Sequence, residues 1–314
     1  MLLYFVFIFM GFFLLIKGAD YLVDGASSFA KRFHIPTIVI GLTIVAIGTS
    51  MPELMVSLTA SLKGSSDMSI GNIIGSNIAN LFFILGICSL IKPLKFQKDT
   101  EYFQNFITIF AVFILFYFGN NNSNYIITRQ EGSILVLFAV LFILYNINSA
   151  KKIFLEFNDE KNISILKSIF TIILGIFALK IGGDVVVKYA SKVAFLLGIS
   201  EKIISISIIA FATSLPELIT SVNACIKGDV NMAIGNIIGS QIFNIFLIIG
   251  ISAIFSPIKY SSLYNFDICF LLIGSILFAI IPFIPKKHYM TRFEGAIFTI
   301  SYIFYLAYNV FKLL

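Results

Sequence analysis

Long apolar runs, each about the length of a membrane-spanning helix, recur along almost the whole chain, and short polar segments separate them. A helix that crosses a bilayer needs roughly 20 mostly apolar residues. The pattern therefore predicts an all-α membrane protein with ten transmembrane helices. The predicted spans are residues 2–22, 37–62, 68–91, 102–120, 131–149, 165–187, 203–226, 231–256, 266–284 and 294–312.

Composition supports lipid rather than water as the solvent of this chain. Of its 314 residues, 59% are hydrophobic and only 12% are charged, whereas a soluble domain carries about 25% charged residues. The net charge of +6 does not indicate a nucleic-acid partner, because the basic residues lie in short loops between apolar runs. The three cysteines, Cys88, Cys225 and Cys269, are odd in number and lie in or beside apolar segments, so we interpret them as packing residues.

The two halves of the chain repeat one another. A shift of 164 residues, without a gap, places residues 41–64 over 205–228 and residues 67–87 over 231–251. Such a long register indicates duplication. Each half contains an odd number of predicted spans, so the second half begins on the opposite side of the bilayer. The prediction is therefore two inverted-topology repeats of five helices, as in many secondary transporters.

The predicted domains follow from this duplication. The first five-helix repeat covers residues 1–150, with α-repeat 1 at about 37–91. A short cytoplasmic linker covers 151–164. The second five-helix repeat covers 165–314, with α-repeat 2 at about 203–256. Lysine and arginine are more numerous in the loops that face inward if the N-terminus lies outside. This bias predicts a multi-pass protein of the cell (inner) membrane with both termini extracytoplasmic.

Two acidic residues, Glu53 and Glu217, lie in the middle of spans that contain no other charge, and the repeat superimposes one on the other. A charged carboxylate at mid-membrane costs at least about 2.5–3.5 kcal/mol. The alternative for a single glutamate is a protonated side chain that is hydrogen-bonded within the bundle. A symmetric pair instead indicates a functional site.

A Thr-Ser-x-Pro-Glu motif surrounds each glutamate. Proline within a span removes one backbone N–H and so frees a carbonyl group; in a membrane, a bound cation is one partner for such a carbonyl. Threonine and glutamate four residues apart are expected on one helix face. Hydroxyl, carbonyl and carboxylate oxygens are the ligands of hard cations, although a simple proline kink is the alternative. The motif residues are Thr49, Ser50, Pro52 and Glu53, and Thr213, Ser214, Pro216 and Glu217.

The next span in each half contains Gly-Asn-Ile-Ile-Gly-Ser, residues 71–76 and 235–240. Two glycines at this spacing commonly indicate close helix packing. The serine that ends each motif is followed four residues later by asparagine, which adds two oxygens on one helix face. These pairs are Ser76 with Asn80 and Ser240 with Asn244.

Charge balance favours cation exchange at this site. Two facing carboxylates repel each other unless protons or cations neutralise them. One Ca²⁺, two Na⁺ or two protons would each do so, and competition among these ions gives antiport. The counter-ion stays open between Na⁺, H⁺ and K⁺.

Two other classes of function fit less well. An enzyme needs a catalytic constellation, but we expect the repeat partners Asp20 and Asp184 to cap helix ends. A cation channel would also use an oxygen-lined site, yet inverted repeats favour a transporter. We therefore predict that the chain is not an enzyme.

The paired motifs resemble the α-repeats of the sodium/calcium exchanger family. The resemblance implies Ca²⁺/Na⁺ antiport by alternating access, with the first and sixth helices sliding across a core, no cofactor besides the transported ions and no obligatory protein partner. Asn244 stands where family members often have Asp. The cation ligands implied by the resemblance are Thr49, Ser50, Glu53, Ser76, Asn80, Thr213, Ser214, Glu217, Ser240 and Asn244, with the backbone carbonyls of Ala46 and Ala210.

Overall fold

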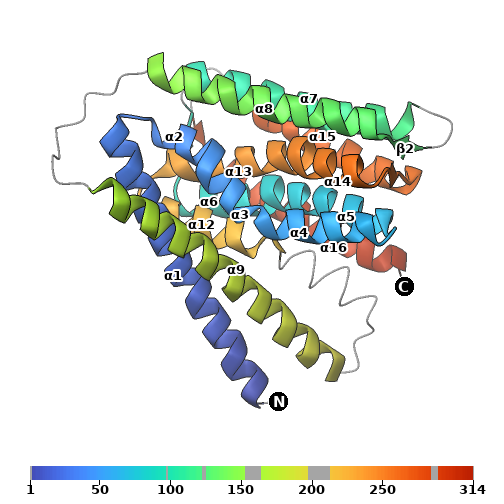
Figure 1. The fold of residues 1–314 in the computed structure, drawn as a ribbon, viewed down its shortest axis with the longest axis horizontal. Coiled ribbons are helices and arrows are strands. Elements are labelled where there is room, and N and C mark those ends of the chain that lie inside the picture. The colour runs from blue at the N-terminus through green and yellow to red at the C-terminus, as the bar shows by residue number, and fades with distance from the viewer. Residues whose placement is uncertain are drawn as a thin grey trace.

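The computed structural model describes residues 2–96, 98–121, 125–152, 164–196, 213–283 and 289–313. These residues form helices that pack side by side, with four strands of two residues each (Figure 1). Elements up to residue 152 are α1 (Leu2–Phe33), α2 (Thr37–Ile40), η1 (Gly41–Val45), α3 (Ala46–Thr49), α4 (Met51–Leu62), α5 (Ser66–Ile78), η2 (Ala79–Ile84), α6 (Leu85–Ile91), β1 (Leu94–Lys95), α7 (Lys98–Asn120), β2 (Ile126–Ile127) and α8 (Arg129–Lys152). The later elements are α9 (Ile165–Leu196), α12 (Leu215–Ile226), α13 (Val230–Phe243), η4 (Asn244–Ile249), α14 (Gly250–Phe255), β3 (Ile258–Lys259), η5 (Ser262–Tyr264), α15 (Asn265–Ile280), η6 (Ile281–Phe283), β4 (Tyr289–Met290) and α16 (Arg292–Leu313).

The helical fold class is confirmed, whereas the ten crossings stay a prediction. Within the described ranges, seven helices are long and apolar enough to span a membrane, or eight if the bent pair α2–α3 and α4 forms one span. The predicted span 203–226 is described only from Thr213, where it contains the short helix α12. Helix α16 has 22 residues but is not among the seven.

Two short antiparallel ladders join the halves of the chain. Strand β1 pairs with β4, with Leu94 opposite Met290, and β2 pairs with β3, with Ile127 opposite Ile258. The 164-residue shift carries β1 onto β3, and a shift of 163 carries β2 onto β4. The ladders are therefore equivalent contacts, and exchanging the two halves converts one into the other.

The last long helix of each half starts in the same way. The backbone N–H of Thr128 donates to Glu131 at 2.7 Å before α8, and that of Thr291 donates to Glu294 at 2.9 Å before α16. A glutamate three residues into the helix that accepts from the capping threonine is a capping box, which defines where a helix begins.

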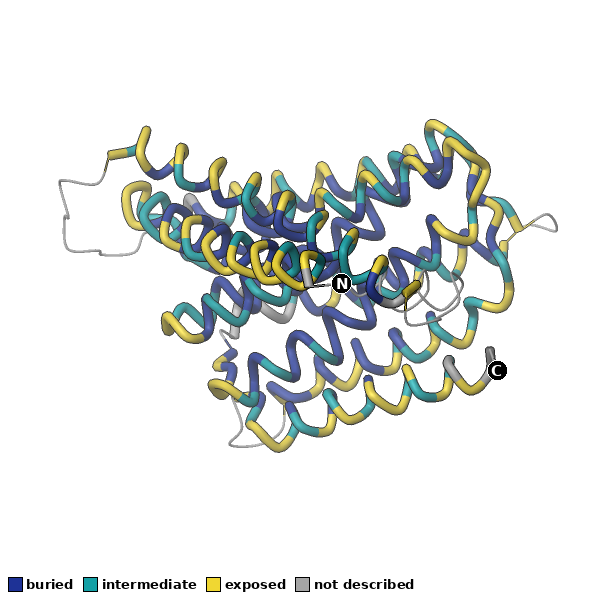
Figure 2. Tube along the Cα trace, turned by 90° about the horizontal axis from the view of Figure 1, so that it is seen from below, coloured by how far each residue is buried: buried dark blue, intermediate teal, exposed yellow. Residues whose placement is uncertain are grey.

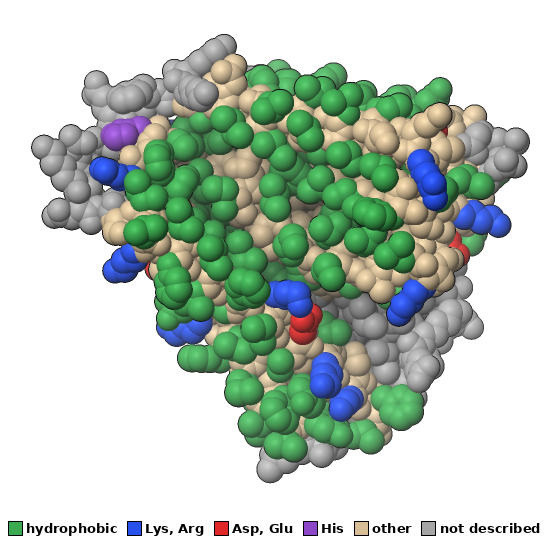
Figure 3. Space-filling view, viewed as in Figure 1, with side chains coloured by type: hydrophobic (Ala, Val, Ile, Leu, Met, Phe, Trp, Pro, Cys, Tyr) green, Lys and Arg blue, Asp and Glu red, His purple; other side chains and the backbone are tan. Residues whose placement is uncertain are grey.

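The two spans that contain the repeated Gly-Asn motif form the centre of the bundle. In the apolar windows of Ser66–Ile91 and Val230–Phe255, 78% and 83% of residues are buried, against 28–44% in the other long spans. Figure 2 shows buried residues along the middle of the molecule and exposed residues along the outer helices. Hydrophobic side chains cover much of the surface in Figure 3, as expected for a lipid-facing exterior.

Helices α1 and α9 form a tightly packed antiparallel pair, and one end of the pair stands away from the other helices (Figure 1). A Cβ atom at Gly18 would lie 3.0 Å from the carbonyl oxygen of Gly175, so only glycine permits this approach. Both helices are longer than the predicted spans 2–22 and 165–187. Helix α1 continues through its polar turns because ion pairs satisfy them, and it ends shortly before Pro36.

We expect Gly182→Ala to loosen this helix pair. A methyl group there would lie 2.8 Å from the Gly11 carbonyl oxygen and 2.9 Å from the Leu15 backbone nitrogen. Backbone atoms cannot rotate away, so the expected cost is about 1–3 kcal/mol. The control is Gly183→Ala, where the nearest described atom is Pro216 Cγ at 3.9 Å. Thermal unfolding in detergent should show a lower Tm for Gly182→Ala only; equal Tm values would contradict the packing account.

Candidate cation-binding site

A break in the helix places each site glutamate in the first turn of a new helix. Helix α3 ends at Thr49, Ser50 has φ −82° and ψ 7°, and α4 begins at Met51 after a bend of 47°. In the second half Ser214 has the same backbone conformation, with φ −85° and ψ 3°, and α12 begins at Leu215. Each motif proline lies in the first turn, where its missing N–H breaks no helical bond. The expectation that Thr49 and Glu53 share one face of a continuous helix is therefore wrong, because the helix ends between them.

The structure brings Glu53 and Glu217 into one buried network, and their side chains are 1% and 0% exposed. Ser50 Oγ donates to Glu217 Oε1 at 2.9 Å, and Ser214 Oγ donates to Glu53 Oε1 at 3.4 Å. Each glutamate thus accepts a hydrogen bond from the serine of the other motif. Ser76 Oγ, in the same half as Glu53, also donates to its Oε1 at 3.5 Å. Both carboxylates also lie at helix N-termini, where the helix dipole favours negative charge.

Two asparagines that we had not assigned to the site connect the halves a second time. Thr49 Oγ1 donates to Asn236 Oδ1 at 3.1 Å, and Thr213 Oγ1 donates to Asn72 Oδ1 at 3.3 Å. The amide nitrogen of each asparagine then donates to a serine at 2.9 Å, Ser57 for Asn72 and Ser221 for Asn236. The asparagine in each copy of Gly-Asn-Ile-Ile-Gly-Ser was the available signal, because a polar residue recurs there inside an apolar span.

Several predicted ligand atoms are buried and lack a hydrogen-bond partner among the described residues. Leaving a buried polar atom unpaired costs roughly 1–3 kcal/mol, and such atoms are few in folded proteins. Their concentration here matches the oxygen-rich environment that a hard cation requires. The oxygens are Glu53 Oε2, Glu217 Oε2, Asn80 Oδ1, Ser240 Oγ and Asn244 Oδ1.

A chain of amide contacts orients Asn244. Asn77 Nδ2 donates to the backbone carbonyl of Gln241 at 3.2 Å, which directs Asn77 Oδ1 toward Asn244. Asn244 Nδ2 donates to that oxygen at 2.9 Å. Asn244 Oδ1 is consequently the atom left unpaired. Asn244 also begins a π-helical segment, η4, as Ala79 beside Asn80 begins η2; π-helical turns occur frequently at functional sites.

The structure gives less support to the two predicted carbonyl ligands, Ala46 and Ala210, than to the side-chain ligands. Ala46 O accepts from Ser50 N at 3.0 Å and from Thr49 Oγ1 at 3.3 Å, so the chain itself already uses this carbonyl. A cation that bound Ala46 O would have to displace one of these donors. Ala210 lies outside the described residues, so both carbonyl ligands stay predictions.

No basic side chain neutralises the two glutamates within the described residues. The ion pairs recorded there involve Lys17, Lys180 and Lys227, and none of them reaches Glu53 or Glu217. Two unpaired carboxylates in a buried site repel each other and lose hydration. The two carboxylates are therefore stable in this site only when protons or cations neutralise their charge.

Duplicated, broken helices that meet at a buried, oxygen-lined acidic site define a multi-pass membrane protein of the ion-transporter class. Comparison with known proteins identifies the family within this class. The chain matches the family described as sodium/calcium exchanger protein over residues 3–148 and 167–311, and it belongs to that family. This confirms the resemblance that the paired motifs indicated.

Individual relatives match over nearly their full lengths. The chain is 33% identical to the sodium/calcium exchanger MaX1 of Methanosarcina acetivorans, covering 96% of this chain and 97% of the relative. It is 32% identical to the inner membrane protein YrbG of Escherichia coli, covering 95% and 94%. Among solved structures, the sodium-calcium exchanger NCX_Mj superimposes with a TM-score of 0.85 at 28% identity, covering 98% of both chains.

Proposed function

We propose that this protein exchanges Ca²⁺ for Na⁺ across the membrane at the site formed by Glu53 and Glu217. The observation that carries the proposal is the crossed pair of serine–glutamate hydrogen bonds, which unites one buried carboxylate from each half. The relatives MaX1 and NCX_Mj are both named as sodium/calcium exchangers. Antiport of Ca²⁺ against H⁺, or exchange that depends on K⁺, is the alternative on the same site.

Coupling follows from the charge of the site. One Ca²⁺ balances the two carboxylates, and sodium ions compete for the same oxygens. A site that holds two bare carboxylates is costly to move past hydrocarbon, so the empty carrier reorients slowly. Ca²⁺ therefore leaves one side only when other cations replace it, and this requirement produces exchange rather than leakage.

The ligand set of this proposal contains hydroxyl, amide and carboxylate oxygens from both halves. Their burial and the unpaired oxygens among them support the assignment. No resident cofactor is included, because the cations are substrates. The proposed ligands are Glu53, Glu217, Thr49, Ser50, Thr213, Ser214, Ser76, Asn80, Ser240 and Asn244, with the carbonyls of Ala46 and Ala210.

The proposed architecture is two inverted repeats of five helices, residues 1–150 and 165–314, that alternate access to the site. The exchange-related ladders and the reciprocal hydrogen bonds support this arrangement. In the proposed motion, α1 and α9 slide together across the remaining helices. Both termini are placed outside the cell, and the linker 151–164 lies mostly outside the described residues. The lipid bilayer is the partner of this fold, and transport requires no second protein.

Ion flux into reconstituted vesicles tests the proposal. Vesicles that contain the protein and are loaded with Na⁺ should accumulate ⁴⁵Ca²⁺ when diluted into Na⁺-free medium. Vesicles loaded with choline should not, because no counter-ion is available. Parallel K⁺ and pH gradients identify a different counter-ion. Uptake that needs no ion inside the vesicle would indicate a channel and refute the antiporter.

A further inference from the structure

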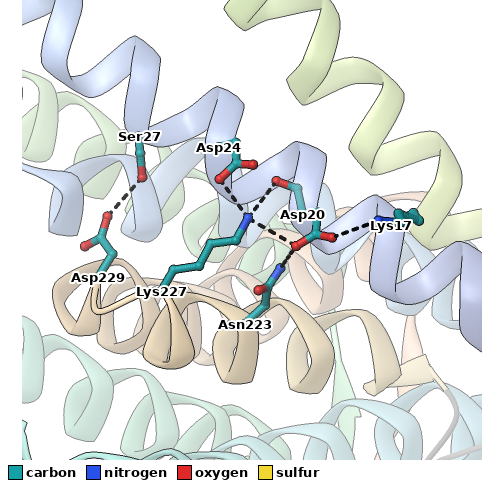
Figure 4. Close-up of polar contacts among 7 residues, drawn as sticks. All are labelled: Lys17, Asp20, Asp24, Ser27, Asn223, Lys227 and Asp229. Carbon is teal, nitrogen blue, oxygen red and sulfur yellow. Dashed lines mark hydrogen bonds and ion pairs between the residues drawn. The ribbon is translucent and has the colours of Figure 1, made fainter.

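A cluster of charged side chains fastens α1 to the end of α12 (Figure 4). Lys227 Nζ lies 2.7 Å from Asp24 Oδ1 and 3.1 Å from Asp20 Oδ1. Asn223 Nδ2 donates to the same oxygen of Asp20 at 3.0 Å. Asp20 thus lies inside α1 and pairs with another helix. The expectation that Asp20 and Asp184 cap helix ends is wrong, because α1 and α9 continue well beyond both residues.

A third acidic residue contacts α1 at the same end of the molecule. Asp229, which caps α13, accepts from Ser27 on α1 at 3.1 Å and from Thr37 on α2 at 2.7 Å. It also accepts from the backbone N–H of Met232 at 3.2 Å. Asp229 therefore both caps α13 and binds α1 through Ser27. We call this end of the molecule the Lys227 end.

The duplication provides a second copy of this cluster for comparison. In the described part of the chain, the repeat partners of Asp20 and Lys227 form no ion pair with each other. The repeat partners of Asp20 and Lys227 are Asp184 on α9 and Lys63 after α4. Asp184 pairs at 3.0 Å with Lys180, four residues earlier on its own helix. Among the described residues Lys63 forms no ion pair, and Ser191, the partner of Ser27, has a buried hydroxyl without a hydrogen bond.

Helix packing shows the same asymmetry. Helix α1 packs along α12, whereas α9 has no comparable contact with α4 in the described part of the chain. In Figure 1 the N-terminal end of α1 and the C-terminal end of α9 stand apart from the other helices. The α1–α9 pair therefore packs against α12 at the Lys227 end and stands apart from the other described helices at the opposite end, which we call the Lys63 end.

The two ends also differ in the charge of their side chains. The repeat partner of Asp24 is Lys188, and the partner of Asp229 is Ser65. At the Lys63 end, closure would bring Lys63 toward Asp184 and a second lysine, Lys188, on α9, whereas at the Lys227 end one lysine meets two aspartates. Burial opposes the charge on Lys227, but its bonds to Asp24 and Asp20 outweigh this effect and raise its pKa. Lys227 therefore stays charged in the cluster.

We propose that Lys227 is a positioning residue that holds the α1–α9 pair closed at the Lys227 end, and that Lys63 and Asp184 form the weaker equivalent contact when the pair slides to the other end. The two contacts exclude each other, because one sliding pair cannot close both ends. The carrier consequently rests with its Lys63 end open. This inference rests on the proposed alternating access and adds the residues that set its balance.

Distances between spin labels on the purified 314-residue chain test whether Lys227 holds the α1–α9 pair closed at the Lys227 end. With Cys269 replaced by Ser and Cys88 and Cys225 buried, labels at Phe33 and Ile91 report the Lys227 end. Labels at Phe195 and Leu62 report the Lys63 end; all four positions are exposed. Lys227→Gln should lengthen the first distance and shorten the second, shifting the ratio of the two states about 3–10-fold, as partly exposed ion pairs allow.

Two further variants sharpen the test. Lys188→Asp gives the Lys63 end the acidic residue that Asp24 supplies at the other end, so it should also populate the state closed there. Lys92→Gln removes a lysine near Gly228 that forms no ion pair among the described residues, so it should leave both distance distributions as in the wild type. The proposal fails if Lys227→Gln behaves like Lys92→Gln, or if one end opens while the other does not close.

The distances require no transport, so the two proposals fail separately. A wild-type chain without Na⁺-driven ⁴⁵Ca²⁺ uptake would refute the exchange function and leave the distance result intact. If exchange proceeds normally but Lys227→Gln and Lys188→Asp leave both distances unchanged, only the proposed role of Lys227 is refuted.

Discussion

Replacing either site glutamate by glutamine, Glu53→Gln or Glu217→Gln, should abolish Na⁺-driven Ca²⁺ uptake while the protein still folds. Glutamine keeps the size of the side chain and an acceptor for the crossed serine hydrogen bond. It removes one of the two charges that face the proposed ion in a buried site. Removing one partner of a buried charge pair costs about 3–5 kcal/mol, so Ca²⁺ affinity should fall by at least about 100-fold.

Glu131→Gln is the matched control. Glu131 caps α8 through the Thr128 backbone N–H at 2.7 Å, and the glutamine oxygen can accept the same bond. Flux is measured as initial ⁴⁵Ca²⁺ uptake at equal reconstituted protein, and folding is checked by size-exclusion chromatography. Wild-type flux in both site variants would end the assignment of this site.

Asn236→Ala should reduce Ca²⁺ uptake by about 5–150-fold. This side chain is fully buried, accepts from Thr49 at 3.1 Å and donates to Ser221 at 2.9 Å. Alanine removes one partner from each hydroxyl, at a cost of roughly 1–3 kcal/mol, and leaves Thr49 only its 3.3 Å hydrogen bond to the Ala46 carbonyl. It also frees Thr49, a proposed ligand, to rotate. The loss should appear chiefly as weaker apparent Ca²⁺ affinity, measured from uptake against Ca²⁺ concentration.

Asn105→Ala removes a buried amide elsewhere in the bundle. Asn105 lies on α7 and is 4% exposed, and neither of its polar side-chain atoms has a hydrogen-bond partner among the described residues. Its loss should leave uptake unchanged, which separates the network at the site from burial of an amide in general. An equal loss in both variants would contradict the positioning role of Asn236.

The sequence was sufficient to predict that Glu53 and Glu217 come together in one buried network, but not how the surrounding side chains connect. Glu53 and Glu217 were evident because a charge within an apolar span is costly and the duplication places one over the other. Their meeting could be inferred from inverted repeats. The same duplication relates the two short ladders, which no apolar pattern indicates, because two-residue strands have no periodicity of their own.

What the sequence did not reveal depends on contacts between distant segments. The partners of Thr49 and Ser50 lie 187 and 167 residues away, so no local pattern could identify them. The sequence analysis did not predict that the helix ends at Thr49, because a proline in the first turn of a helix has the same sequence signature as one inside a continuous helix. Asp20 was assigned to a helix end because its partner, Lys227, belongs to the other half of the chain.

The central claim is that one cation lies between the glutamates of the two halves. Anomalous diffraction from crystals of this protein soaked in Sr²⁺, a heavier analogue of Ca²⁺, locates that ion directly. We expect one peak within ligand distance, about 2.3–2.6 Å for calcium, of oxygens of both Glu53 and Glu217. This peak should be lost in the double variant Glu53→Gln, Glu217→Gln. A peak that contacts neither glutamate, or one that persists in the double variant, would contradict this claim.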